Sequence, residues 1–410
     1  MEVARMYIQR HIEAVLVDLL TQYPCVLISG PRQVGKSTLV ENLKDARGRT
    51  YITLDDDELR EVANSDPKLF MQLHQPPICI DEIQKAPKLF SYIKIHIDKT
   101  HRPGDFILTG SQVYKLMTGI KETMTGRIAF LDMQGISLSE TMGLPNLPFL
   151  PDLKNYRDRK PQKSMNASMI FERIHRGSMP SILSGAYKDT ARYYSAYVST
   201  YLQKDINDLI PGIDVLKFRR FITACACRTG TLKNVNAIAQ DAEISVITAN
   251  NWLNVLETIG VIFFLHPYSN NLLTRTIKTP KLYFYDTGLV CYLCKWQSGE
   301  TVAVGAQAGA LLETFTVSEI MKTYYNAGKE PYIYYYRDID SKEMDLIVEH
   351  NQKLYPIEIK KAAMVDHRIA KTFDLIGKSG LSQGTGAILC LSDQIGAINP
   401  NTLTIPISLL

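Results

Sequence analysis

The sequence lacks any long hydrophobic run. No apolar stretch in its 410 residues approaches the roughly 18 residues that a membrane-spanning helix requires. Residues 1–20 are charged and amphipathic, with Arg5, Arg10, Glu13 and Asp18 among them, which is unlike a secretory signal peptide. We therefore expect a cytoplasmic protein with no membrane partner.

Cysteine is scarce and scattered. The chain has seven cysteines, and an odd count without a secretory signal points to reduced thiols. Cys225-x-Cys227 and Cys291-x-x-Cys294 invite a zinc interpretation, but no histidine stands at the spacing that would complete such a site. We therefore expect no zinc centre.

A strong charge of either sign is also missing. Lys and Arg number 46 against 42 Asp and Glu, a formal net charge of +4, which permits a nucleic-acid partner but does not argue for one. The hydrophobic content of 45% and the charged content of 21% are those of an ordinary globular protein. A chain of this length suggests roughly two to four domains.

The most informative stretch that is present spans residues 25–38. An apolar run typical of a buried strand ends at Gly30, and Gly35-Lys36-Ser37 opens a helix-forming run, which completes the pattern G-x-x-x-x-G-K-[ST]. The two glycines let backbone N–H groups wrap a phosphate, and the helix N-terminus adds a partial positive charge. The sequence therefore predicts that a nucleoside triphosphate binds to Gly30, Pro31, Arg32, Gln33, Val34, Gly35, Lys36, Ser37 and Thr38.

Four side chains have expected roles in hydrolysis or metal binding. Lys36 is expected to reach the β- and γ-phosphates, and the Ser37 hydroxyl to bind Mg²⁺. A second apolar strand, residues 78–80, runs into Asp81 and Glu82. Because ligands lie beyond the carboxyl ends of the strands in an α/β sheet, we expect Asp81 in the Mg²⁺ shell and Glu82 at the attacking water. The alternative is a solvated acidic pair.

Two more residues are assigned from their places beside strands. Thr109 or Ser111, at the end of a buried strand, would touch the γ-phosphate or the water, unless this is an ordinary strand-to-turn transition. Arg127 suits a charge clamp that a neighbouring subunit of a ring-like homo-oligomer supplies to the transition state. A plain surface arginine is the alternative.

Five motifs in order carry a family resemblance: Gly-Pro-Arg-Gln-Val-Gly-Lys-Ser (30–37), Leu-Asp-Asp (54–56), Ile-Asp-Glu-Ile-Gln-Lys-Ala-Pro (80–87), Leu-Thr-Gly-Ser-Gln (108–112) and Thr-Gly-Arg (125–127). They resemble a group of prokaryotic AAA+ ATPases whose C-terminal half is catalogued only as a domain of unknown function. Tyr-Asp-Thr-Gly-Leu (285–289), Leu-Leu-Glu (311–313), Tyr-Arg-Asp (336–338) and Pro-Ile-Glu-Ile-Lys (356–360) match that half. The resemblance implies an AAA+ core, a winged-helix-like middle and a nuclease-like end, with ATP as the nucleotide.

The middle of the chain is mainly helical in pattern. Residues 143–163 are rich in proline and predict a linker or long loop, and residues 166–210 predict a helical lid. Three helices and two strands then follow in the order of a winged helix-turn-helix, at residues 215–227, 234–241, 245–258, 261–265 and 281–285.

Whether this middle part contacts DNA is open from the sequence. The expected recognition helix, which starts at Ser245, has no Lys or Arg, although Asn250 and Asn251 could read adenine edges. Cations lie instead in the first helix and the presumed wing: Lys217, Arg219, Arg220, Arg228, Arg275, Lys278 and Lys281. A DNA contact made by the wing and a purely protein-packing role are both retained.

The C-terminal part carries a second group of charged residues. Glu358 and Lys360 project from one face of a strand, and Asp345 lies on the adjacent strand. Two such carboxylates can share a divalent cation while a lysine orients water. This resembles the PD-(D/E)xK nuclease superfamily, with Asp345 and Glu358 as metal ligands and Glu313 as the helix acid. The alternative is an amphipathic strand with solvent-facing charges.

The expected fold class is α/β: a P-loop NTPase AAA+ parallel sheet with a helical lid, a winged-helix domain and an α/β PD-(D/E)xK-like domain. The expected boundaries are 1–143, 144–212, 213–290 and 291–410. One functional hypothesis is Mg²⁺-dependent ATP hydrolysis coupled to DNA binding or remodelling, with a C-terminal nuclease site. The other is a nucleotide-dependent switch in signalling or defence, similar to signal-transduction ATPases, whose C-terminal domain only binds a partner.

Overall fold

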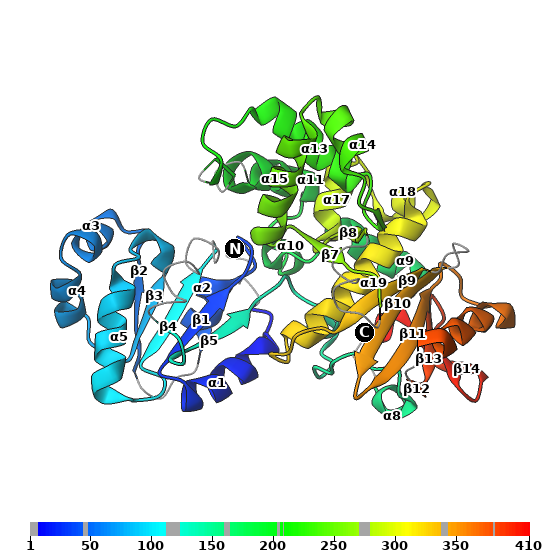
Figure 1. Cartoon of the computed structure of the whole chain (residues 1–410), viewed down its shortest axis with the longest axis horizontal. Helices are drawn as coiled ribbons and strands as arrows, with labels where there is room; N and C mark the ends of the chain where they lie inside the picture. The colour runs from blue at the N-terminus through cyan, green and yellow to red at the C-terminus, as the bar shows by residue number, and fades with distance from the viewer. Residues whose placement is uncertain are drawn as a thin grey trace.

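The structure is a computed structural model of the chain that describes residues 7–43, 48–111, 124–159, 165–202, 206–207, 209–269, 279–337, 343–379 and 382–410. A five-stranded sheet lies at one end, a seven-stranded sheet at the other, and a group of helices with a three-stranded sheet lies between and above them (Figure 1). None of the helices in these ranges combines the length and apolarity that crossing a lipid bilayer requires.

The N-terminal sheet is parallel, with strand order β2-β3-β4-β1-β5. Every residue of its three central strands is buried, which explains why those strands are nearly continuous apolar runs. The predicted parallel core is therefore confirmed. The strands are β1 (Cys25–Ser29), β2 (Thr50–Thr53), β3 (Ile78–Asp81), β4 (Phe106–Gly110) and β5 (Ile128–Asp132).

Two apolar clusters cover the two faces of this sheet. Leu27 and Leu108 belong to one cluster, whereas Val26 and Ile107 belong to the other, as the alternation of side chains along a strand requires. The Asp56 carboxylate accepts the first free N–H groups of a helix, so the acidic run after β2 begins that helix. The helices are α1 (Ile12–Gln22), α2 (Lys36–Asn42), α3 (Asp57–Ser65), α4 (Pro67–Leu73), η1 (Ile83–Lys85) and α5 (Leu89–Thr100).

The segment after β5 leaves the sheet and packs along the rest of the molecule. It contains α7 (Leu138–Met142) and α8 (Leu153–Tyr156). Phe149 is buried, and its N–H donates to the Thr323 hydroxyl at 3.0 Å. In the described part of the predicted linker or long loop, apolar side chains such as Phe149 and Tyr156 join the main core.

The middle part contains the predicted helices and hairpin. Each observed end lies within one residue of the prediction, and Asp214, Asn234 and Ser245 cap the three helices. Strand β8 pairs antiparallel with both β6 and β7. The elements are α9 (Ala167–Arg176), α10 (Pro180–Leu183), α11 (Thr190–Ala196), η2 (Tyr197–Leu202), α13 (Val215–Ala226), β6 (Thr231–Leu232), α14 (Val235–Ala242), α15 (Val246–Thr258), β7 (Ile262–Leu265) and β8 (Lys281–Phe284).

The C-terminal sheet is mixed, with order β14-β15-β13-β11-β10-β9 and β12 beside β11. Strand β11 is antiparallel to β10 and parallel to β13. Its elements are α17 (Thr287–Leu293), α18 (Gly299–Val304), α19 (Ala308–Tyr325), β9 (Ile333–Arg337), β10 (Glu343–His350), β11 (Lys353–Ile359), η3 (His367–Ser379), β12 (Ser382–Gln383), β13 (Gly386–Cys390), β14 (Gly396–Asn399), β15 (Thr402–Pro406) and η4 (Ile407–Leu409).

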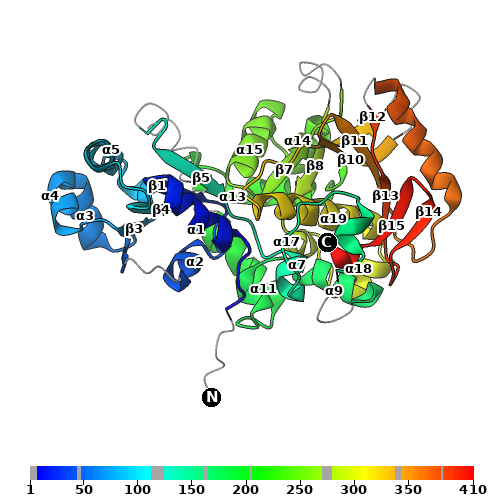
Figure 2. The same ribbon diagram turned by 90° about the horizontal axis from the view of Figure 1, so that it is seen from below.

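The three parts that follow the parallel sheet share one core. A single apolar cluster includes Phe149 of the loop, Trp252 of α15 and Leu312 of α19. Figure 2 shows the same arrangement from below, with the C-terminal sheet and the middle helices packed together at a distance from β2. The expected boundary at residue 290 would cut α17, because that helix continues to Leu293.

Candidate nucleotide site

The phosphate-binding loop connects the carboxyl end of β1 to the first turn of α2. Gly30 has a φ of +143°, and a Cβ there would lie 2.0 Å from the Met133 carbonyl oxygen, so a side chain does not fit. Gly35 has a φ of +95° directly before α2. The Lys36 ammonium donates to the carbonyl oxygens of Gly30 and Pro31, each at 2.8 Å. The lysine side chain therefore folds back over the loop.

Asp81 joins this loop to the neighbouring strands. Its Oδ2 accepts hydrogen bonds from Ser37 Oγ at 3.0 Å and from the Tyr51 hydroxyl at 2.8 Å, and its Oδ1 accepts one from Thr109. Burial, together with the Asp81 carboxylate, raises the pKa of Tyr51 and keeps this hydroxyl a donor. Carboxylate and hydroxyl oxygens are the ligands that Mg²⁺ prefers, so Ser37 and Asp81 fit that ion.

Glu82 and Ser111 lie at the same edge of the sheet. Glu82 follows β3 in a left-handed backbone conformation, with a φ of 56°. Gln84 Nε2 donates to the Glu82 carboxylate and lies 3.5 Å from the Ser111 hydroxyl. Burial raises the pKa of Glu82, although the Lys36 ammonium opposes that shift. The structure thus brings together five of the predicted residues: Lys36, Ser37, Asp81, Glu82 and Ser111.

Arg127 lies at the amino-terminal end of the parallel strands, opposite the end that carries the phosphate loop. It directly precedes β5, whose first residue pairs with the first residue of β1, whereas the phosphate loop follows the last residue of β1. The two ends of a five-residue strand are roughly 16 Å apart. Arg127 pairs with Asp98 of α5 and donates to the Thr125 carbonyl oxygen at 2.9 Å. Within one chain, Arg127 is therefore remote from the phosphate loop.

Arg10, in the N-terminal segment, contacts the phosphate loop. No role at this site is predicted for it from the sequence. Its Nη1 donates to the Val34 carbonyl oxygen at 2.9 Å, its Nη2 to that of Gln134 at 2.8 Å, and its Nε pairs with Glu140 at 2.9 Å. Burial alone would raise the pKa of Glu140, but the Arg10 guanidinium and the Ser137 N–H lower it. Glu140 therefore stays an anion that holds Arg10 against the loop.

The middle part of the chain also touches the phosphate loop. Gly260, after α15, has a φ of +72°, and a Cβ there would lie 2.8 Å from Pro31 Cγ. The Tyr193 hydroxyl of α11 donates to Gln33 Oε1 at 3.1 Å. A partly open cavity of about 250 Å³ lies between the sheet edge and this middle part, and its lining includes Ser29, Gly30, Ser111, Glu257, Thr258 and Tyr285.

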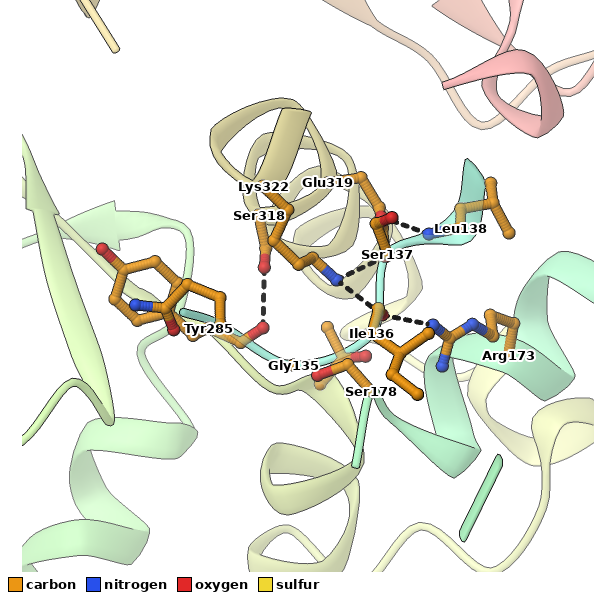
Figure 3. A network of polar contacts seen from close by, with 12 residues as sticks. Gly135, Ile136, Ser137, Leu138, Arg173, Ser178, Tyr285, Ser318, Glu319 and Lys322 are labelled. Carbon is orange, nitrogen blue, oxygen red and sulfur yellow. Dashed lines mark hydrogen bonds and ion pairs between the residues drawn. The ribbon is translucent and has the colours of Figure 1, made fainter. Parts of the chain in front are cut away.

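A buried polar junction lies where the segment after β5 passes α9 and α19 (Figure 3). The Ile136 carbonyl oxygen accepts hydrogen bonds from Arg173 at 2.8 Å and Lys322 at 3.4 Å. The Glu319 carboxylate accepts from the Leu138 N–H at 2.7 Å and from Lys322 at 2.6 Å. These contacts connect α19 of the C-terminal part to the chain that leaves the nucleotide edge.

The residues predicted for a nuclease site form a second cluster. Lys360 Nζ lies 3.2 Å from Asp345 Oδ2 and also contacts the Glu358 carboxylate. Asp345 Oδ2 accepts a hydrogen bond from the Ile359 N–H at 2.8 Å. Burial, together with the Asp345 carboxylate, raises the pKa of Glu358 to about 8. Glu358 is only 4% exposed, so the solvent-facing alternative is wrong for this residue.

Lys281 of β8 enters the same cluster. Its Nζ lies 3.1 Å from Glu313 Oε1 and 2.5 Å from Glu343 Oε1. Although burial opposes the shift, these carboxylates raise the pKa of Lys281, which stays a cation. From the sequence, Lys281 is counted among the cations of a presumed wing, but this side chain is buried, which favours the packing alternative for this residue; Arg275 and Lys278 lie outside the described residues.

The described part of the chain holds no group of three or more His, Cys, Asp or Glu side chains arranged to bind a metal ion. In the C-terminal cluster, Lys360 contacts both predicted ligands, Asp345 and Glu358, and Lys281 contacts Glu313. Two ammonium groups thus lie among the carboxylates at the place where the sequence predicts a divalent cation.

The parallel sheet and its phosphate loop have the arrangement of a P-loop domain, and sequence comparison identifies an AAA domain in the same part of the chain. The AAA domain family matches residues 22–142. Two domains of unknown function follow: DUF8612 matches residues 168–300 and DUF4143 matches residues 308–410. The AAA domain implies ATP binding, in agreement with the nucleotide that the family resemblance implies.

Relatives with a similar sequence include the uncharacterized proteins Mb2031c of Mycobacterium bovis and Rv2008c of Mycobacterium tuberculosis. Each is 27% identical over 356 residues, which cover 87% of this chain and 74% of the relative. Among solved structures, the chain is similar to the Walker-type ATPase PABY2304 of Pyrococcus abyssi, with 14% identity and a TM-score of 0.44. That match covers 69% of this chain and 94% of the other.

Proposed function

We propose that the chain binds ATP with Mg²⁺ and hydrolyses it at the carboxyl edge of the five-stranded sheet. The contact between Ser37 Oγ and Asp81 Oδ2 at 3.0 Å carries this proposal, because it joins the phosphate loop to the strand acid. Ser37 and Asp81 would hold the Mg²⁺, which would neutralise charge on the phosphate oxygens. Lys36 would exchange the carbonyl oxygens of its own loop for the β- and γ-phosphates.

Glu82 is proposed to orient the attacking water and to accept its proton. Burial raises the pKa of this carboxyl group and so brings it closer to the value that suits a general base at neutral pH. Gln84 fixes the Glu82 carboxylate toward Ser111, which is proposed to contact the γ-phosphate or the water.

Replacing Glu82 by glutamine is expected to lower ATP turnover by about 10²-fold or more while ATP binding persists, because the amide cannot accept the proton. Steady-state phosphate release and the affinity for a fluorescent ATP analogue would be measured together. Glu58→Gln, an exposed carboxyl on α3, is the matched control and should turn over ATP normally. Unchanged turnover in Glu82→Gln would contradict the assignment.

Of the two functional hypotheses, we favour a nucleotide-dependent switch over ATP hydrolysis coupled to DNA binding. The contact between Gly260 and Pro31 supports it, because the phosphate loop is the part that must adjust when a nucleotide binds. Tyr193 touches the same loop through Gln33. A change at the loop would thus displace the middle part, which shares its core with the C-terminal part. The C-terminal part would then expose or withdraw a surface that binds a partner.

Coupling of ATP hydrolysis to DNA binding stays a prediction. Of the basic residues on and beside α13, Arg220 pairs with Glu243 and Arg228 with Asp241, each at 2.6 Å. Both pairs reduce the positive charge that could meet phosphates, so these contacts favour the switch over a DNA-bound motor. A ring-like homo-oligomer with Arg127 acting on a neighbouring nucleotide is likewise a proposal, and the distance of Arg127 from its own loop supports it.

We further propose a division into a nucleotide-binding core, residues 1–143, and one body with a helical lid, a winged-helix-like part and a PD-(D/E)xK-like part. Two observations support the winged-helix assignment: the chain order α13, α14, α15, β7, β8, and the antiparallel pairing of β7 with β8. The proximity of Asp345, Glu358 and Lys360 supports the nuclease-like assignment.

If that cluster cleaves DNA, Asp345→Asn should abolish cutting and leave ATP turnover unchanged, because Asp345 contacts the lysine and neighbours both glutamates. The assay uses single-stranded, duplex and branched DNA with Mg²⁺ or Mn²⁺. Asp393→Asn, an exposed carboxyl of the same part, is the control. Absence of cutting by the unmodified chain on all three substrates would refute the nuclease assignment.

A further inference from the structure

In the structure, one cysteine of each sequence motif lies beside a cysteine of the other motif. Cys225 and Cys291 are buried, whereas Cys227 is exposed and Cys294 is partly exposed. The Sγ atoms of Cys227 and Cys294 lie 3.6 Å apart although 67 residues separate them in the chain. Each of these two cysteines directly follows the last turn of its helix, Cys227 after α13 and Cys294 after α17. One thiol from each motif therefore meets the other.

Neighbouring contacts fix this pair in place. Gln307 Nε2 donates to the Cys227 carbonyl oxygen at 3.1 Å, and Gln307 Oε1 accepts from the Trp296 indole N–H at 2.9 Å. Beside the thiols, Arg228 pairs with Asp241. The helices themselves share the main apolar cluster, because Ala226 and Leu293, the last residues of α13 and α17, both belong to it. The two sulfurs are thus held near each other by packing on both sides.

We propose that Cys227 and Cys294 form a reversible redox modification site, which a low-molecular-weight disulfide such as oxidised glutathione converts into an intramolecular disulfide. The sulfurs have to approach by about 1.5 Å to reach a bond length of about 2.05 Å, a movement small enough for two side chains at helix ends. The site is independent of the nucleotide proposal, since neither cysteine lines the phosphate loop.

The chemistry is thiol–disulfide exchange in two steps. The Cys227 thiolate attacks one sulfur of the oxidised glutathione, which forms a mixed disulfide and releases one glutathione thiolate. Cys294 then loses its proton and attacks Cys227 Sγ, which forms the Cys227–Cys294 bond and releases the second thiolate. The two protein thiols together lose two electrons, which reduce the glutathione disulfide. Their two protons end on the two released glutathione thiols.

Local electrostatics assign Cys227 as the attacking sulfur. The hydrogen bond between the two thiols lowers the pKa of Cys227 to about 6, and the Arg228 guanidinium acts in the same direction, against partial burial and Asp241. The same hydrogen bond raises the pKa of Cys294, which therefore stays protonated until the second step. Burial raises the pKa of Cys225 and Cys291 and leaves them unreactive.

The test incubates the full chain with oxidised glutathione, alkylates it in denaturant and maps its peptides without reduction. We expect the count of free thiols to fall from seven to about five, with a single cross-linked peptide pair that joins Cys227 to Cys294. Dithiothreitol should restore all seven thiols. The five other cysteines in the same sample serve as the internal control.

Two variants separate the steps. Cys294→Ser should accumulate the mixed disulfide on Cys227, and Cys227→Ser should leave Cys294 at least about 10-fold slower to react than Cys227 is in the unmodified chain. The proposal is overturned if the unmodified chain stops at the mixed disulfide, if Cys227 reacts no faster than Cys225 or Cys291, or if the cross-link joins another pair. The mapping of the unmodified chain decides these points without any variant having to fold.

Discussion

Replacing Lys36 by methionine is expected to reduce ATP turnover by about 10²–10³-fold, the range found when one charged or hydrogen-bonding group is removed from a transition state. Charge develops on the transferring phosphoryl group, and Lys36 is the cation that its loop can direct there. Methionine keeps most of the apolar stem but carries no charge. The measurement is the rate of phosphate release at saturating ATP and Mg²⁺.

The variant should remain folded. Lys36 is 7% exposed, and its ammonium satisfies the carbonyl oxygens of Gly30 and Pro31. Removing the ammonium takes one hydrogen-bond donor from each of these two carbonyl oxygens, which lowers the free energy of unfolding by roughly 1–3 kcal/mol. A small fall in the thermal midpoint is therefore expected, without loss of the helical circular dichroism signal.

The matched control is Lys99→Met, an exposed lysine in the last turn of α5, which should leave both turnover and thermal midpoint unchanged. Affinity for a fluorescent ATP analogue should fall in Lys36→Met, because the lost contact is with the nucleotide itself. Full turnover in a folded Lys36→Met protein would contradict the ATP site and every proposal that depends on it.

The residues at the nucleotide edge could be predicted because local sequence determines them. The phosphate loop is one uninterrupted stretch, and Asp81 and Glu82 follow an apolar strand whose end must lie at the same sheet edge as the loop. The helices of the middle part could be predicted for the same reason, since their caps, such as Ser245 and Asp214, begin helices through contacts three residues away or closer.

The residues that join distant parts of the chain could not be predicted. Arg10 pairs with Glu140 across 130 residues, and Tyr51 with Asp81 across 30, and no spacing rule links such partners. Lys281 is counted among the wing cations from the sequence, but Glu313 and Glu343 hold it in the interior, where a lysine is rarely found unless it is paired. Only the tertiary arrangement brings these charges together.

Replacing Gly260 by alanine is expected to raise ATP turnover roughly 10-fold. The added Cβ would lie 2.8 Å from Pro31 Cγ, and the proline ring can move Cγ aside only by a change of ring pucker. Either the middle part or the phosphate loop must therefore shift, which weakens the contact that restrains the loop. A coupling free energy of about 1–3 kcal/mol between two sites corresponds to changes of this size.

Gly212→Ala is the matched control for this variant. Gly212 has a φ of +76°, close to the +72° of Gly260, but a Cβ there would have nothing within 4 Å. Both alanines carry the same backbone cost of roughly 1 kcal/mol for a left-handed conformation, so the difference between the two variants isolates the contact with Pro31. Phosphate release and the dissociation rate of a fluorescent ADP analogue should both rise in Gly260→Ala alone. Turnover in Gly260→Ala that is equal to or below that of Gly212→Ala would contradict a restraining role and return the middle part to a purely structural one.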